Sequence, residues 1–252
     1  MNQSEKIASF DRIKDMIGIV VVSAEHNKEK LAHVPHERME DLAVVYSLGA
    51  GDKVGMITNE DLKKMGITED QLRHAAMEQA PNSHQLTIKT IEEALGMPDS
   101  SELESRELYV ASTADAFLGA GVIAYPGFME KAAEITGGDF YVLPSSIHEV
   151  LLMQDRGETN AAELQGMVKG INESEVSPEE RLSNNVYHYD SKEKIFETAD
   201  KFEARMEKEK EAEKSADKGS VLDKLDAGKE KADKDISLKV KVKSDKNREQ
   251  SR

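Results

Sequence analysis

Short apolar segments separated by charged stretches run through the first 200 residues. MIGIVVVS (16–23), LAVVYSL (42–48) and KVGMIT (53–58) are rich in β-branched residues, and runs of this length favour strands over helices. The turn residues GAGD separate the last two runs, so we expect these two strands to form a hairpin. Between the first two runs, a charged stretch predicts a helix that is broken at Pro35.

Two helices are predicted between residues 59 and 80. Asn59 is the expected N-cap of the first helix, and Gly66 is its expected end. Thr68 followed by Gln71 forms a capping-box pattern for the second helix, which we expect to stop before Pro81.

The second half of the chain also mixes the two kinds of element. The sequence predicts strands at 85–90 and 107–113, a strand followed by a Pro-Gly helix start at 120–138, two strands around a turn at 139–155, a helix at 158–176, a short helical turn at 177–185 and a hairpin at 185–198. Because several hairpins occur and no regular β-α repeat is present, the pattern is typical of an α+β fold with mixed or antiparallel sheets and packed helices.

Composition divides the chain into a body and a tail. We expect an α+β body at 10–197, in two halves joined by an acidic connector near 98–106, and a charged tail at 198–252. The tail has too few apolar residues to bury a core, so it is predicted to be helical or disordered. A small apolar cluster in it, a predicted docking segment for a protein partner, consists of Val221, Leu222 and Leu225.

Charge is distributed unequally between these parts. Residues 1–200 carry 36 acidic and 18 basic side chains, a net charge of −18, whereas 201–252 carry 13 acidic and 16 basic side chains, a net charge of +3. An acidic body repels the phosphate backbone, which basic patches bind. We therefore place no nucleic acid on the body.

Two further absences in the sequence bound the function. Cysteine is absent, which excludes a disulfide framework, a thiol nucleophile and cysteine-based metal sites, and fits a reducing compartment. The N-terminal residues lack the apolar core of a signal peptide, and the longest apolar runs are much shorter than the roughly 18 residues needed to cross a bilayer. The sequence predicts a cytoplasmic protein with no membrane attachment.

One segment, DFYVLPSSIHEVLLMQD (139–155), carries candidate catalytic groups: Ser145, Ser146, His148 and Glu149. A serine hydrolase needs a hydroxyl within hydrogen-bond reach of a base, and a group that orients the base. On a strand, Ser146 and His148 share a face, whereas His148 and Glu149 point to opposite faces. The nucleophile elbow G-x-S-x-G is missing. We interpret the segment as a hairpin with a structural histidine, and keep as the alternative a site formed by these residues with His188.

No metal or cofactor site is predicted. His33, His36 and Glu37 do not follow H-E-x-x-H, and a proline interrupts the helix that would align two imidazoles. His188 lies between two tyrosines and has no second ligand nearby in the sequence. LGAGVIAYPG lacks the third glycine of a dinucleotide-binding fingerprint, so its glycines predict a turn or close packing.

Four segments together resemble a known family: NKEKLAHVPHERMEDLAVVYSL, MITNEDLKKMGITEDQLRHAAMEQAP, GAGVIAYPGFMEKAAEITGGDFYVLPSSIHEVLLMQD and GMVKGINESEVSPEERLSNNVYHYD. They are similar to a "domain of unknown function" family of uncharacterised cytoplasmic proteins from clostridial and related gut Firmicutes, often associated with mobile genetic elements. The resemblance covers roughly residues 10–197. It implies that a further N-terminal region usually precedes this part, and that VASTADAFLGAG replaces a Thr-Asn-Lys segment. It implies no activity and no catalytic residue.

Three functional hypotheses follow from the sequence. The first is a non-enzymatic binding or accessory protein of a bacterial mobile element, with the tail as a tether or docking segment. The second is a hydrolase or ligand-binding enzyme that uses Ser146 and His148, with Glu149 or His188, and it requires these groups to converge in one pocket. The third is an acidic mimic of nucleic acid, which requires a contiguous carboxylate face.

Overall fold

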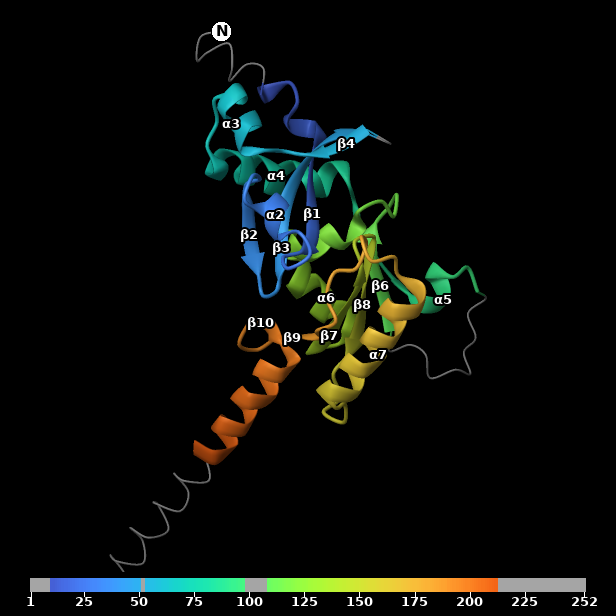
Figure 1. The fold of residues 1–252 in the computed structure, drawn as a ribbon. Helices are drawn as coiled ribbons and strands as arrows, with labels where there is room; N and C mark the ends of the chain where they lie inside the picture. Colours follow the sequence, from blue (N-terminus) through green and yellow to red (C-terminus); the bar gives the residue numbers. More distant parts are fainter. Residues whose placement is uncertain (1–9, 51–52, 98–107, 213–252) are drawn as a thin grey trace, which may run out of the picture. The chain divides into compact units, whose positions relative to one another are not determined.

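The computed structural model describes residues 10–50, 53–97 and 108–212. The chain divides into two compact units, Met1–Phe202 and Glu203–Arg252. The described part of the first unit contains two antiparallel sheets with packed helices (Figure 1), which confirms the predicted α+β class. In the second unit, residues 203–212 are helical. None of the described helices combines the length and the apolar composition needed to cross a membrane.

The first sheet has the strand order β1-β3-β2, and β4 also pairs with β3. Its strands are β1 (Ile17–Ser23), β2 (His36–Met39), β3 (Leu42–Ala50) and β4 (Lys53–Met56). β1, β3 and β4 follow the apolar runs, and the predicted β3–β4 hairpin is confirmed. The sequence did not predict β2, and the helix expected before it is limited to α2 (Lys28–Leu31). β2 forms a strand because Met39 pairs with Leu42 across a two-residue turn, in which Glu40 has a φ of 56°.

Two capped helices lead away from this sheet. They are α3 (Asn59–Met65) and α4 (Glu69–Ser83). The predicted capping box at Thr68 and Gln71 is confirmed. The prediction of Asn59 as the first N-cap is wrong, because Thr58 takes that position and forms its own capping box.

α4 continues through Pro81 instead of stopping before it. Proline lacks a backbone N–H and cannot donate a helical hydrogen bond. Pro81 lies in the last turn of α4, so only one hydrogen bond is lost, close to the end of the helix. His84 N still donates to Ala80 O at 2.8 Å and ends the helix. Leu72 and Ala76 are fully buried on the face that packs against β1, so the short apolar stripe of this helix is sufficient to hold it on the sheet.

The second sheet has six strands in the order β10-β9-β7-β8-β6-β5. They are β5 (Leu86–Thr90), β6 (Leu108–Thr113), β7 (Phe140–Ser146), β8 (Glu149–Gln154), β9 (Tyr187–Asp190) and β10 (Ile195–Thr198), and the helices beside them are α5 (Ile91–Ala94), α6 (Phe128–Thr136) and α7 (Ala161–Glu175). Both predicted hairpins, β7–β8 and β9–β10, are confirmed. The connector near 98–106 joins β5 to β6, which pair within this one sheet.

Side-chain alternation along β7 explains why this sheet has helices on both faces. Phe140 and Val142 belong to the large core shared with α6, whereas Tyr141 and Leu143 belong to a separate core beneath α7. The period of two along a strand sends successive residues to opposite faces. The predicted helical turn at 177–185 is wrong: residues 178–180 form a turn, because Ile147 N donates to Glu180 O and ties this segment to the β7–β8 hairpin.

A 3-10 helix, η2 (Gly119–Ala124), lies between the two sheets, where the sequence predicted a strand. A β-carbon on Gly121 would lie 2.1 Å from Ile19 O of β1, and one on Gly119 would lie 2.0 Å from Ser112 Oγ of β6. The predicted role of these glycines in close packing is thus confirmed. Because neither glycine has a side chain, this segment can approach β1 and β6 more closely than any other residue would allow.

Asp41 joins the turn of the β2–β3 hairpin to the segment before β9. Its carboxylate accepts hydrogen bonds from Ser183 Oγ at 2.5 Å, Asn185 Nδ2 at 3.1 Å and Tyr187 Oη at 2.5 Å. Burial, followed by the charge of Asp41, raises the pKa of Tyr187 above its ordinary value. The two sheets are therefore connected by hydrogen bonds as well as through η2.

We expect Gly121→Ala to destabilise the protein by about 1–3 kcal/mol or more, because the new methyl group overlaps the carbonyl of Ile19. Gly170→Ala in α7 is the matched control, since nothing lies within 4 Å of its β-carbon position, and it is expected to stabilise the helix by up to about 1 kcal/mol. Urea unfolding followed by circular dichroism measures both. Equal effects of the two substitutions would contradict the packing argument.

Candidate functional site

The β7–β8 turn uses its polar residues to hold its own backbone. His148 N donates to Ser146 Oγ at 3.1 Å, and Ser146 pairs with Glu149 across the turn. Ser112 Oγ donates to His148 O at 2.7 Å. The side chain of Ser145 lies outside the part of the chain that the structure describes. The hydroxyl of Ser146 thus contacts the backbone of His148 and not its ring.

Both ring nitrogens of His148 contact other groups. Leu118 N donates to Nδ1 at 3.3 Å, so Nδ1 carries no hydrogen and Nε2 is the donor to Glu180 Oε1, 3.4 Å away. Hydrogen bonds from Ser177 and then from His148 lower the pKa of Glu180 below its ordinary value. His148 therefore connects the loop before η2 to the segment after α7.

His188 lies elsewhere in the second sheet. It pairs with Tyr141 near the start of β7, about five residues from Ser146 and therefore roughly 17 Å along the strand. Its side chain is fully buried, and Nε2 lies 3.0 Å from Asp155 Oδ2. The ring of Phe202 stacks on it at 3.5 Å. The structure does not bring His188 together with the β7–β8 turn.

Asp155 is a partner of His188 that the sequence did not reveal. The hydrogen bond from His188 lowers the pKa of Asp155 below its ordinary value, against the opposing effect of burial. His188 Nδ1 is buried and has no hydrogen-bond partner among the described residues. A buried imidazole that is stacked and held by one carboxylate fixes the position of β9, and its closed surroundings leave no space for a substrate.

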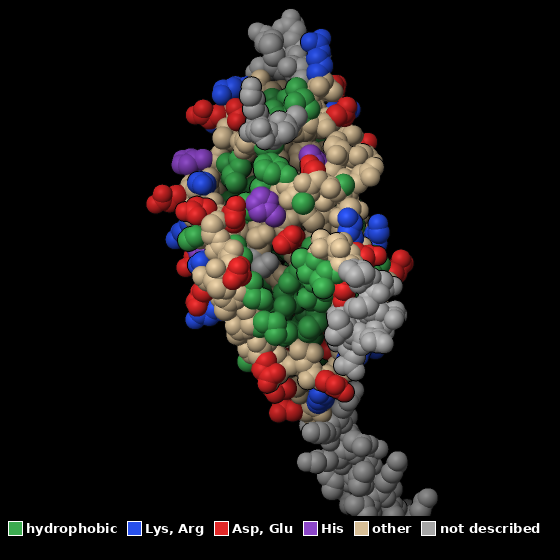
Figure 2. Space-filling view, turned by 90° about the vertical axis from the view of Figure 1, so that its right-hand side faces the viewer, with side chains coloured by type: hydrophobic (Ala, Val, Ile, Leu, Met, Phe, Trp, Pro, Cys, Tyr) green, Lys and Arg blue, Asp and Glu red, His purple; other side chains and the backbone are tan. Residues whose placement is uncertain are grey.

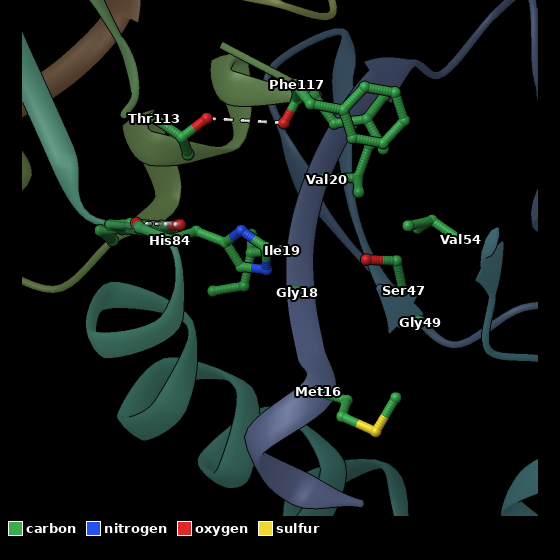
Figure 3. Close-up of a pocket in the computed structure, with 12 residues that line it drawn as sticks. Met16, Gly18, Ile19, Val20, Ser47, Gly49, Val54, His84, Thr113 and Phe117 are labelled. Atoms are coloured by element: carbon green, nitrogen blue, oxygen red, sulfur yellow. Dashed lines mark hydrogen bonds between the residues drawn. The ribbon is translucent and has the colours of Figure 1, made fainter. Parts of the chain in front are cut away.

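A pocket lies where β1, β3, the end of α4 and the loop before η2 meet (Figure 3). The enclosed volume is small, about 30 Å³ for the centres of water-sized molecules, and the rest of the space between the lining residues is open to solvent. Its apolar walls are formed by Met16, Val20, Val54, Phe117 and Leu118, and the polar side chains that line it are Ser47, His84, Thr113 and Tyr125. Apolar walls with a few polar groups are typical of small-ligand sites.

His84 is held in place by its position at the end of α4. Its backbone carbonyl accepts a hydrogen bond from Tyr125 Oη at 3.1 Å, and its ring Nδ1 lies 3.7 Å from Asp115 Oδ2. Burial and then the charge of Asp115 raise the pKa of Tyr125 to about 12, so this hydroxyl remains a donor over the whole neutral range. The opposite ring edge of His84, with Nε2, is directed towards β1.

The carboxylate of Asp115 shapes the pocket loop, which is residues 114–118. Its Oδ1 accepts hydrogen bonds from Thr113 Oγ1 at 2.7 Å and Phe117 N at 3.4 Å. Burial raises the pKa of Asp115, but these hydrogen bonds and the charge of His84 outweigh it, so the pKa lies below its ordinary value. Ala116 and Leu118 have positive φ angles of 54° and 52°. Such backbone strain persists only where surrounding contacts hold it, and it is frequent at binding sites.

Gly18 separates the hydroxyl of Ser47 from the imidazole of His84. Ser47 is the direct partner of Gly18 in the β1–β3 pairing. A β-carbon on Gly18 would lie 2.7 Å from Ser47 Oγ and 3.7 Å from His84 Nε2. Figure 3 shows the two polar groups on either side of Gly18. Because Gly18 has no side chain, Ser47 Oγ can lie close to β1, and it borders the same part of the pocket as His84 Nε2.

The sequence analysis did not identify these residues. Gly18, Ser47, His84 and Asp115 come from four separate elements, and no short motif connects them. One signal was present: Gly18 interrupts the β-branched run IGIVVV, and a glycine inside a strand indicates a bulge or the close approach of another group. Its partners could not be named without the tertiary structure.

Neither a metal site nor a charged face is evident in the described part of the molecule. The described residues contain no group of three or more His, Asp or Glu side chains placed to hold a metal ion. Of the residues that the sequence analysis considered as metal ligands, His36 lies at the start of β2, and its Nδ1 contacts Val34 O at 3.0 Å. On the face shown in Figure 2, acidic side chains are interspersed with basic ones and with hydrophobic patches, so they form no continuous carboxylate surface there.

We expect His148→Gln to accelerate hydrogen exchange at the amide of Leu118, because it removes the ring nitrogen that this amide contacts. The global loss of stability should be about 1 kcal/mol, as for one hydrogen bond. His74→Gln is the control, since the exposed His74 contacts only Glu78 on its own helix. Unchanged exchange at Leu118 would refute the role of His148 in holding the loop.

Asp155→Asn should lower stability at neutral pH by about 1.5–3 kcal/mol, because a hydrogen bond to a charged group is lost. The folded-state pKa of Asp155 is depressed, so its contribution is fully present above the unfolded value of about 3.9 and is lost as pH falls through the folded value. Thermal unfolding from about pH 7 to pH 2 should therefore show the variant and the wild type converging below about pH 4. Asp70→Asn, in an exposed pair with Arg73, is the control and should have little effect at any pH.

Comparisons with known proteins give one match. No curated protein and no solved structure matches the chain. A family model described as a family of unknown function, DUF5688, matches residues 1–191, which include both sheets up to the end of β9 and all the residues around the pocket. The chain therefore belongs to the family of unknown function DUF5688.

Proposed function

We propose that this protein is a non-enzymatic binding protein, and that the pocket beside Gly18 holds its small-molecule ligand. The observation that carries the proposal is the pocket itself, in which the polar side chains of Ser47 and His84 lie on either side of Gly18 among apolar walls. A glycine inside a buried β-branched strand indicates the close approach of another group, and here that group is the pocket hydroxyl of Ser47.

The absence of an activated nucleophile favours binding over catalysis. In the described residues, no serine or threonine hydroxyl is hydrogen-bonded to a histidine ring. Nucleophilic catalysis by serine requires such a contact with a base. At the β7–β8 turn the ring of His148 contacts Leu118 and Glu180, so the hydrolase alternative has no base available to Ser146.

Electrostatics restrict the class of ligand. Residues 1–200 carry a net charge of −18, and Asp115 lies beside the pocket. An anionic ligand would be repelled by both. The apolar walls suit a neutral ligand, of which only a small part enters the pocket while the rest lies at its open mouth.

The setting in which the protein binds this ligand is also part of the proposal. The sequence resemblance supports an origin in clostridial or related Firmicutes, a cytoplasmic location and an accessory role on a mobile genetic element. The composition of the tail supports a second contact, with a protein partner, through Val221, Leu222 and Leu225, which lie outside the described residues.

A fragment screen on the full chain, followed by amide NMR shifts, tests the proposal. We expect hits to shift the amides of Gly18, Val20 and Val54 in the wild type. Gly18→Ala should weaken binding of those hits about tenfold or more, since its methyl group enters the pocket and displaces the hydroxyl of Ser47.

The control for this experiment is Gly55→Ala in β4. Gly55 has no atom within 4 Å of its β-carbon position and does not line the pocket. Fragments should therefore bind Gly55→Ala and the wild type equally well, provided that circular dichroism shows all three chains folded. Hits that cluster elsewhere, or that bind Gly18→Ala unchanged, would contradict the proposal.

A further inference from the structure

We propose that the ligand presents a hydroxyl group on an apolar stem, and that Ser47 Oγ and His84 Nε2 hold this hydroxyl over Gly18. The inference rests on the proposed function and names the ligand chemistry of the same pocket. The proximity of the two groups carries it: Ser47 Oγ and His84 Nε2 lie 2.7 Å and 3.7 Å from one point beside Gly18, so their separation is at most the sum of these distances, which two hydrogen bonds of about 2.8 Å to one hydroxyl nearly span.

The hydrogen-bonding capacity of these two groups is unused in the described structure. No described residue forms a hydrogen bond with Ser47 Oγ or with His84 Nε2. Ser47 is only 6% exposed, so solvent reaches its hydroxyl mainly through the pocket. A ligand that supplies a hydrogen-bond partner to each of these groups, in a site partly withdrawn from water, gains the net free energy of those bonds.

The environment of His84 determines which hydrogen bond each group makes. In the neutral imidazole, Asp115 Oδ2 beside Nδ1 stabilises a hydrogen on that nitrogen, and Nε2 is then the acceptor. Ser47 can donate its hydroxyl hydrogen. A ligand hydroxyl is itself both donor and acceptor: it donates to His84 Nε2 and accepts from Ser47 Oγ. An alcohol or phenol therefore matches both groups at once.

Other polar groups match the site less well. An ammonium group would lose much of its hydration, and Asp115, its nearest counter-charge among the pocket groups, lies on the far side of the His84 ring. A carboxylate cannot donate to Nε2 and is repelled by Asp115. An apolar group would leave both Ser47 and His84 without a partner, which is the situation in which enzymes and binding proteins discriminate strongly between ligands.

The stem of the ligand would lie against the apolar side of the pocket. Figure 3 shows Val20, Val54 and Phe117 on the side of the pocket that also holds Ser47, with Met16 at its other end. Phe117 and Met16 remain 45% and 42% exposed, so they offer apolar surface to a ligand. Covering this surface adds roughly 25 cal/mol for each Å² removed from water.

Four probes of nearly equal shape test the inference on the full chain. They are benzyl alcohol, ethylbenzene, benzylamine and benzoate, which place a hydroxyl, a methyl, an ammonium and a carboxylate group beside the same ring. Amide NMR titrations measure each dissociation constant at the pocket amides. We expect benzyl alcohol to bind about tenfold more tightly than ethylbenzene, as two hydrogen bonds of ordinary strength would give, and the two charged probes to bind more weakly still.

Two substitutions test whether Ser47 and His84 cause the preference for benzyl alcohol over ethylbenzene. Ser47→Ala and His84→Phe should each weaken benzyl alcohol about threefold to tenfold, in line with the loss of one hydrogen bond, and leave ethylbenzene nearly unchanged. The matched control is Ser23→Ala, since Ser23 is equally buried, at 6% exposed, in β1 but does not line the pocket. It should affect neither probe.

The outcomes separate this inference from the function on which it rests. Equal binding of benzyl alcohol and ethylbenzene, or tighter binding of benzylamine, would overturn the hydroxyl preference while the pocket remains a ligand site. An alcohol preference that survives both Ser47→Ala and His84→Phe would also overturn it. If none of the four probes shifts the pocket amides, the inference and the proposed function both fail.

Discussion

The close approach of η2 to the edge of β1 is the constraint on which the rest of the described body depends. β1 pairs with β3 on one side only, and its other edge would present unpaired backbone groups to solvent. η2 covers that edge at a distance that only glycine allows, because a β-carbon at Gly121 would overlap Ile19 O. Since the same short helix also contacts β6 through Gly119, it joins the two sheets into one body.

The pocket is a consequence of this junction. The loop that leads into η2 must leave β6, turn sharply and place Gly119 against Ser112, and Asp115 closes that turn with two hydrogen bonds. The turn brings Phe117 and Leu118 to the side of β1 where Gly18 lies. Packing that holds the sheets together and the space that could hold a ligand are therefore set by the same few residues, and substitutions there would affect both stability and binding.

Four histidines among the described residues lie beside a carboxylate; His74 is exposed on its own helix, and the surroundings of the other three assign them different roles. His188 is fully buried beside Asp155 and has an aromatic ring stacked on it, so it serves packing. His148 contacts Glu180 and a backbone amide, so both nitrogens are occupied in holding two segments together. His84 has Asp115 at one nitrogen only, and its other nitrogen is directed towards Gly18 and the pocket. Only this third arrangement leaves a polar atom available to a ligand.

The sequence by itself determined the elements whose signals are local. Strands β1, β3 and β4, the two hairpins of the second sheet, the capping box at Thr68 and the amphipathic α7 all follow from patterns that span fewer than about 20 residues. β2, η2 and the passage of α4 through Pro81 were not predicted, because contacts with distant residues override weak local preferences there. The candidate site was not predicted for the same reason. Gly18, Ser47, His84 and Asp115 are separated by up to 97 positions, and only the packing of η2 against β1 brings them to one place.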